Sequence, residues 1–201
     1  MKKLLILAAA ICLIACSESN EEKAGKLAKE ALNSVIVNIE TYEPIETIVD
    51  SAFAPLTSPE MFNLFAQLPD QFRVYANNQE EMERAKITMS IYDNAYSSYE
   101  KESYNRAKED YERYSRRVAD FEEKMHAFTE KLKRYSNEEP VFCGYKVRHK
   151  YRFVSKEGEK SIGEYLFLMN KELTAVESMI DMDDEVIKAL IQSAEMSDFA
   201  E

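Results

Sequence analysis

Between Asn77 and Asn137 the chain contains no glycine and no proline, and this stretch limits the possible folds more than any other feature. Apolar residues recur there at alternating steps of three and four, which is the spacing of packed amphipathic helices. The longest such series comprises Tyr104, Ala107, Tyr111, Tyr114, Val118, Phe121, Met125, Phe128, Leu132 and Tyr135. The stretch therefore predicts long helices with one apolar stripe each.

A second, shorter series precedes this one and is out of phase with it. It comprises Met82, Ala85, Met89, Tyr92, Tyr96 and Tyr99. The step from Tyr99 to Tyr104 is five residues, so either one helix slips register there or the chain turns back as an antiparallel hairpin. A single helix of about 60 residues would be roughly 90 Å long, with much of its aromatic stripe unpartnered. We therefore favour a hairpin that turns at residues 100–103.

After Pro140 the apolar period changes from helical spacing to two, which is the period of a strand. One face of this strand carries Val141, Cys143, Tyr145, Val147, His149, Tyr151 and Phe153. The residues up to Ile180 then predict a three-stranded antiparallel meander over 141–180, with turns at 155–160 and 170–172 and a last strand from Leu173. A capped helix follows Asp181.

Upstream, residues 21–38 have helical spacing, and the alternation after Pro44 predicts an edge strand, because proline is tolerated at a strand start. Ser58-Pro59-Glu60 is a typical start of a short helix. The order of elements is similar to a cystatin-like α+β fold, in which an antiparallel sheet wraps around its first helix. We expect one domain over 23–201 with this α+β fold and a helical insertion at about 56–137.

The N-terminus has the layout of a secretory targeting signal. Met1-Lys2-Lys3 precedes an apolar run that ends in Leu13-Ile14-Ala15-Cys16. The run is about a dozen residues, too short to span a membrane, which needs roughly 20. Leu13-Ile14-Ala15-Cys16 resembles the lipobox of bacterial lipoproteins, which implies cleavage of a signal peptide, 1–15, and lipidation of Cys16. The alternative is an ordinary secretory signal with a chance cysteine.

The lipoprotein resemblance implies a cell-envelope location. Ser17 after the cysteine goes with sorting to the outer membrane in many such lipoproteins, with either a periplasmic or a surface-exposed orientation. Residues 16–22 are expected to form an acidic tether. Residues 42–53 together with 144–152 also resemble a recurring group of small uncharacterised envelope lipoproteins, a resemblance that implies no activity.

The net charge argues against some classes of partner, and the cysteine content argues against a disulfide. Removal of residues 1–15 takes away Lys2 and Lys3 and no acid, so the net charge of −11 becomes −13. Such a chain is not expected to bind nucleic acid or anionic headgroups in general. The lipoprotein resemblance implies that Cys12 is removed with the signal and that Cys16 is lipidated. Cys143 is then expected to have no intramolecular partner, and no disulfide is expected.

No catalytic or metal-binding motif is present in the sequence, and no cofactor is expected. We therefore predict a protein without enzymatic activity. His149 and Cys143 are interpreted as core residues on the apolar strand face, and the acids at 181–185 as helix caps.

Four cations alternate along the other face of the same strand, about 6.7 Å apart. They are Lys146, Arg148, Lys150 and Arg152. They are candidates for binding an anionic ligand or glycan, although pairing with the many acids of the chain is the favoured interpretation.

Two functions remain open. The first is a non-enzymatic interaction or structural module whose helical insertion binds another envelope protein, since tyrosines crowd the insertion and tyrosine is favoured at interfaces. These are Tyr75, Tyr92, Tyr96, Tyr99, Tyr104, Tyr111 and Tyr114. Packing of these rings within the protein is the slightly favoured alternative. The second function is binding of a small ligand or glycan through the basic strand face.

Overall fold

The computed structural model describes residues 18–198, with side chains up to residue 192. The chain divides into two compact units, Met1–Ala66 with Pro140–Asp183 and Gln67–Glu139 with Asp184–Glu201. The boundary between residues 66 and 67 lies inside a helix that begins in one unit and continues into the other. The expected α+β class with a long helical insertion is confirmed.

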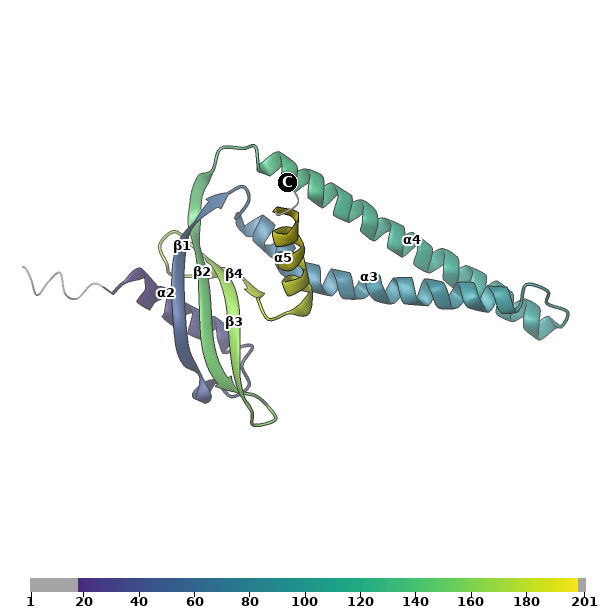
Figure 1. Cartoon of the computed structure of the whole chain (residues 1–201), viewed down its shortest axis with the longest axis horizontal. Helices are drawn as coiled ribbons and strands as arrows, with labels where there is room; N and C mark the ends of the chain where they lie inside the picture. Colours follow the sequence, from purple (N-terminus) through teal and green to yellow (C-terminus); the bar gives the residue numbers. More distant parts are fainter. Residues whose placement is uncertain (1–17, 199–201) are drawn as a thin grey trace, which may run out of the picture. The chain divides into compact units, whose positions relative to one another are not determined.

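The first unit is built on a four-stranded antiparallel sheet in the order β1-β2-β3-β4 (Figure 1). The strands are β1 (Glu43–Ala54), β2 (Val141–Val154), β3 (Lys160–Met169) and β4 (Val176–Asp181). This arrangement confirms the edge strand and the C-terminal meander. The predicted start of the last strand at Leu173 is wrong, because Leu173 lies in the preceding turn with a positive φ of 51°. The Asn170 side chain holds that turn by accepting hydrogen bonds from the amides of Thr174 and Ala175.

Helix α2 (Asn20–Leu32) covers one face of the sheet (Figure 1). Its buried residues are Ala24, Ala28 and Leu32, and the two alanines let the helix backbone approach the strands closely. Ser19 and Glu22 form a capping box at its start, so residues 20–22 of the expected tether are helical. The helix also ends earlier than residue 38. A short 3₁₀ helix, η1 (Ile39–Thr41), follows.

Strand β2 contains a bulge near its start, which alters the predicted alternation. Phe53 pairs with Phe142 and Ala52 pairs with Gly144, so Cys143 is the extra residue. As a result Phe142, rather than Cys143, packs beside Tyr145, with their ring centroids 5.4 Å apart. The alternation is thus broken at Cys143, which is half-buried, whereas Val147, His149 and Tyr151 are buried as expected.

The second unit contains the helical hairpin, which confirms the hairpin in place of one continuous helix. Helix α3 (Pro59–Ile91) starts in the first unit, and α4 (Ser98–Tyr135) runs back antiparallel to it (Figure 1). The turn lies at 92–97, before the predicted position. Ser97 and Glu100 form a capping box that starts α4, so Glu100 is helical and not part of the turn.

The predicted short helix near Pro59 is in fact the first part of α3, which continues through Pro69. Proline removes one hydrogen bond from a helix interior, and for that reason the sequence suggested a break. Apolar residues on both sides of Pro69 are packed, since Leu68 is buried and the Phe72 ring lies 5.3 Å from that of Phe121. Packing of this face outweighs the lost hydrogen bond.

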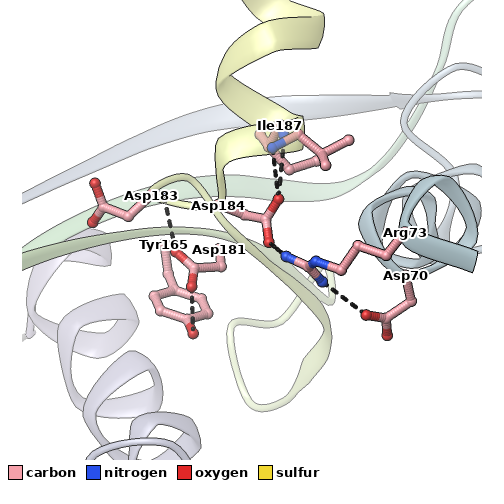
Figure 2. A network of polar contacts seen from close by, with 8 residues as sticks. Asp70, Arg73, Tyr165, Asp181, Asp183, Asp184 and Ile187 are labelled. Carbon is pink, nitrogen blue, oxygen red and sulfur yellow. Dashed lines mark hydrogen bonds and ion pairs between the residues drawn. The ribbon is translucent and has the colours of Figure 1, made fainter. Parts of the chain in front are cut away.

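Helix α5 (Glu185–Asp198) completes the second unit. Its cap is Asp184, whose carboxylate accepts hydrogen bonds from the amides of Val186 and Ile187 and forms an ion pair with Arg73 of α3 (Figure 2). Burial alone would raise the pKa of Asp184, but these hydrogen bonds and the Arg73 charge lower it overall. The predicted capping role of this acidic segment is confirmed for Asp184.

Candidate functional sites

The basic strand face is matched by acids on both neighbouring strands. Arg148 lies 3.6 Å from Glu164 of β3, and Arg152 lies 3.2 Å from Glu43 of β1. In the strand register, Lys146 is opposite Asp50. Lys150 is opposite Glu46 on one side and Glu164 on the other.

Because each cation has an acid directly or diagonally across from it, the local charge is close to neutral. Exposed pairs of this kind contribute little to stability, typically below about 1 kcal/mol. The four cations therefore lie opposite or diagonal to acids of the neighbouring strands, as the favoured interpretation of the sequence expects.

His149 is a fully buried side chain with both ring nitrogens hydrogen-bonded. The Tyr42 hydroxyl lies 2.6 Å from its Nε2 and the Thr47 hydroxyl 2.9 Å from its Nδ1. Burial lowers the pKa of His149 and raises that of Tyr42 to about 12, so both groups are neutral near pH 7. Full burial and the two hydrogen bonds fit the predicted hydrogen-bonded core histidine.

The predicted tyrosine stripe divides into packed and exposed members. Tyr75 stacks on Phe121 at a centroid distance of 4.5 Å, and its hydroxyl donates to the Glu122 carboxylate. The half-buried rings are Tyr92, Tyr104, Tyr111 and Tyr114. The two tyrosines nearest the turn differ, since Tyr96 is 91% and Tyr99 71% exposed. Packing thus explains most of the stripe but not its end at the turn.

Two further apolar residues are exposed beside these tyrosines. Ile87 and Ile91 lie one helical turn apart on α3, and Ile91 is 68% exposed. We call Ile87, Ile91, Tyr96 and Tyr99 the hairpin tip. The sequence analysis did not identify the two isoleucines, although they fall outside the heptad stripe and so could not lie in the helix–helix seam.

A groove between α3 and α4 adjoins the hairpin tip. Its volume is about 370 Å³, and the rings of Tyr92, Tyr99 and Tyr114 line it. Its floor includes the buried Ala85 and Ala107, whose small side chains leave space between the helices. Tyr99 belongs both to the groove and to the exposed tip.

Other predicted features are placed as follows. Cys16 lies outside the described residues. Cys143 has a free thiol that donates to the Thr57 carbonyl at 3.5 Å. Within residues 18–198, no group of three or more His, Cys, Asp or Glu is arranged to hold a metal ion. In the same part of the chain, no helix has an apolar stretch long enough to cross a membrane.

Comparison with known proteins adds no relative: no protein-family model, no curated protein and no solved structure matches the chain.

Proposed function

We propose that this protein is a lipid-anchored, non-enzymatic module of the bacterial outer membrane that binds another envelope protein through its helical hairpin. The lipobox-like Leu13-Ile14-Ala15-Cys16 supports the anchor. A single acyl chain holds a protein only marginally at a membrane, whereas the several chains of a lipoprotein cysteine hold it stably. Cys16 is therefore the residue that keeps the protein at the envelope.

The exposed hairpin tip is the observation that supports partner binding. Four large apolar side chains lie within two helical turns of one chain reversal, and two of them are tyrosines. Tyrosine contributes apolar area together with a hydroxyl at low entropic cost, and such rings are enriched at interfaces. The adjoining groove offers a recess for a partner's apolar side chain.

The length of the hairpin suits this role. At 1.5 Å per residue, the 38 residues of α4 extend about 57 Å. The two helices therefore separate the tip from the opposite end of the hairpin by a distance larger than a typical small domain. A lipid at Cys16 would fix the protein at the membrane while the hairpin presents its tip to a partner.

The anchor and the interaction are tested separately. Metabolic labelling of cells with a fatty-acid analogue should label the wild-type chain and not a Cys16→Ser variant. An unlabelled wild-type chain would refute the anchor. Protease treatment of intact cells then separates surface exposure from a periplasmic orientation.

For the interaction, a photo-crosslinking residue at position 99 should yield a defined crosslinked protein in intact cells. Ile91→Ser together with Tyr96→Ser should abolish that product, because both exposed apolar contacts are lost. The matched control is Val141→Ser, since Val141 is 63% exposed but lies on the sheet. A product that persists in the tip variant, or that the control also abolishes, would refute the role of the hairpin tip.

A further inference from the structure

A cavity of about 390 Å³ lies at one end of the sheet, and all of its walls belong to the first unit. The loop after α2 contributes Val35, Ile36 and Val37, and β2 and β3 contribute Phe153 and Ile162. The size is within the range of small-molecule sites, which are typically about 300 to 1,000 Å³. These walls alone would suit any apolar molecule.

The loop wall of the cavity is tied to the sheet. The Asn38 side-chain amide donates to the carbonyls of Val154 and Ser155, both at 3.2 Å. The Thr41 hydroxyl accepts from the amide of Val154 at 2.9 Å. These bonds join the segment that follows the loop to the end of β2, so the cavity is preformed rather than dependent on a ligand to assemble it.

One polar group in this cavity lacks a hydrogen-bond partner. Tyr151 is only 3% exposed, and its hydroxyl has no hydrogen bond to any of the described residues. No fully buried side-chain nitrogen or oxygen in this part of the chain lacks a partner, so the hydroxyl oxygen keeps some accessible surface, and Tyr151 is one of the residues that line the cavity. Gly163 leaves the space for it, because a Cβ there would lie 2.7 Å from that oxygen. A phenol buried to this extent normally finds a partner.

Two carboxylates stand beside the tyrosines at the same cavity. Asp181 accepts from the Tyr165 hydroxyl at 3.3 Å and from the amide of Asp183 at 2.8 Å (Figure 2). Asp183 in turn accepts from the amide of Glu164 at 3.0 Å. Both acids are held in place by the backbone of β3 and of the segment after β4, and both line the cavity.

The negative charges of these two acids affect the pKa values of two tyrosines that line the cavity. Burial, and after it the charges of Asp181 and Asp183, raise the pKa of Tyr151 to about 12. The pKa of Tyr165 is raised chiefly by burial and next by the charge of Asp181, with smaller contributions from Tyr151, from the hydrogen bond to Asp181 and from the charge of Asp183. The carboxylates that make a negative charge on these phenols less favourable would make a positive charge in the cavity more favourable.

We propose that this cavity binds a small organic amine, whose ammonium group lies between the Tyr151 hydroxyl and the carboxylates of Asp181 and Asp183. An ammonium group has three donors and a positive charge, so it can donate to the phenol oxygen and to a carboxylate at once. The aromatic faces of the tyrosines add a favourable cation–π interaction. The apolar part of the amine lies against the loop wall.

An anionic or a neutral ligand fits this cavity less well than a cationic one. Lys156 is the one cation among the residues that line the cavity, and Glu157 lies beside it at the rim. Together with Asp181 and Asp183, the lining carries three acids and one base. An anionic ligand would meet a net negative charge, and a neutral one would leave the field of the carboxylates unused.

The same ammonium chemistry can come from a free amine or from a lysine side chain of another protein. The two sources are distinguished with 2-phenylethylamine and Nα-acetyl-lysine amide as probes. Their binding to the chain from residue 16 onward, with Cys16→Ser to remove the lipid, can be followed by NMR titration. The neutral and anionic counterparts, 2-phenylethanol and 3-phenylpropionate, report the contribution of charge.

We expect saturable binding of at least one amine probe at millimolar concentration and at least tenfold weaker binding of the neutral and anionic counterparts. Asp181→Asn with Asp183→Asn should weaken amine binding about tenfold, and Tyr151→Phe about fivefold. The matched control is Glu177→Gln, which removes one acid from an exposed position of β4 and should change nothing.

Three outcomes would overturn the proposal. They are absence of saturable binding for both amines, equal binding of 2-phenylethylamine and 2-phenylethanol, and unchanged binding in the double aspartate variant. None of these results bears on the hairpin tip, because the cavity and the tip belong to different units.

Discussion

Replacement of His149 by alanine should be the most destabilising change in the sheet core that removes a polar side chain. The substitution leaves the hydroxyls of Tyr42 and Thr47 without their partners. Both residues are half-buried, so each lost partner should cost about 1 kcal/mol, the low end of the usual range. Removing a fully buried ring adds a cavity term of about 2 kcal/mol. The expected loss is therefore about 3 to 5 kcal/mol.

Urea denaturation followed by circular dichroism measures this loss, and amide hydrogen exchange shows whether it is centred on β2. His126 provides a matched control, since it is the only other histidine and is exposed on α4. His126→Ala should change stability by less than about 0.5 kcal/mol. A double-mutant cycle with Tyr42→Phe should give a coupling energy near 1 kcal/mol. A loss below about 1 kcal/mol for His149→Ala, or zero coupling, would refute the core role.

The same residue predicts a pH dependence. Burial lowers the pKa of His149 below its unfolded value of 6.5. The unfolded chain therefore binds the proton more readily than the folded one, and the contribution of His149 is complete above about pH 6.5. It should be lost progressively as the pH falls below 6.5 toward the lowered folded pKa. A His149→Ala variant should lack this part of the pH profile, and an identical profile would contradict the assignment.

Three other substitutions test the local structure. Gly144→Ala should cost about 2 to 3 kcal/mol in urea denaturation, because its Cβ would lie 2.2 Å from the backbone oxygen of Met169. Gly25 lies inside α2, and an added Cβ would meet only the Thr47 hydroxyl of β1 at 3.5 Å, which is an ordinary contact. Gly25→Ala should therefore stabilise the protein by about 0.5 to 1 kcal/mol, and a loss as large as that of Gly144→Ala would contradict this reasoning. Ser97→Ala should cost about 1 kcal/mol and speed hydrogen exchange in the first turn of α4, because it breaks the capping box with Glu100; unchanged exchange there would refute the cap.

The elements that could be predicted from the sequence are those whose apolar period is long and unbroken. The alternation from Tyr145 to Phe153 predicted the core face of β2, and the heptads predicted α4 over nearly its full length. In both cases a wrong register would turn a whole row of apolar side chains toward water. The free-energy cost of exposing apolar side chains is repeated at every position of the row, so the apolar period is clear in the sequence.

The errors fall where one residue or one hydrogen bond decides the structure. The hairpin turn was placed at residues 100–103 from a break in the heptads, although Ser97-x-x-Glu100 is a capping-box signature that marks the start of α4. Next to the bulge at Cys143, Gly144 lies close to the backbone of Met169, which is a contact between distant parts of the chain. Periodicity carries no information about such a contact.

The cavity beside Tyr151 could not be predicted at all, because its walls come from four separate segments. From the sequence, His149 and Tyr151 are equivalent, since both are polar-tipped residues on the buried face of one strand. The structure separates them by their partners. Both nitrogens of His149 are hydrogen-bonded, whereas Tyr151 lines the cavity and its hydroxyl has no hydrogen bond to the described residues. His149 is thus assigned a role in folding, and Tyr151, two residues further along the strand, a role in binding.

This difference leads to a last prediction. Tyr151→Phe removes a hydroxyl that has no hydrogen bond to the described residues, so stability in urea should stay within about 0.5 kcal/mol of wild type or rise slightly. His149→Ala, two residues away, should cost several times more. The contrast matters because it makes Tyr151→Phe a folded variant in which weaker amine binding reports the loss of the hydroxyl alone. A loss of more than about 1 kcal/mol would mean that the hydroxyl already has a structural partner, and the case for a ligand at that position would fail.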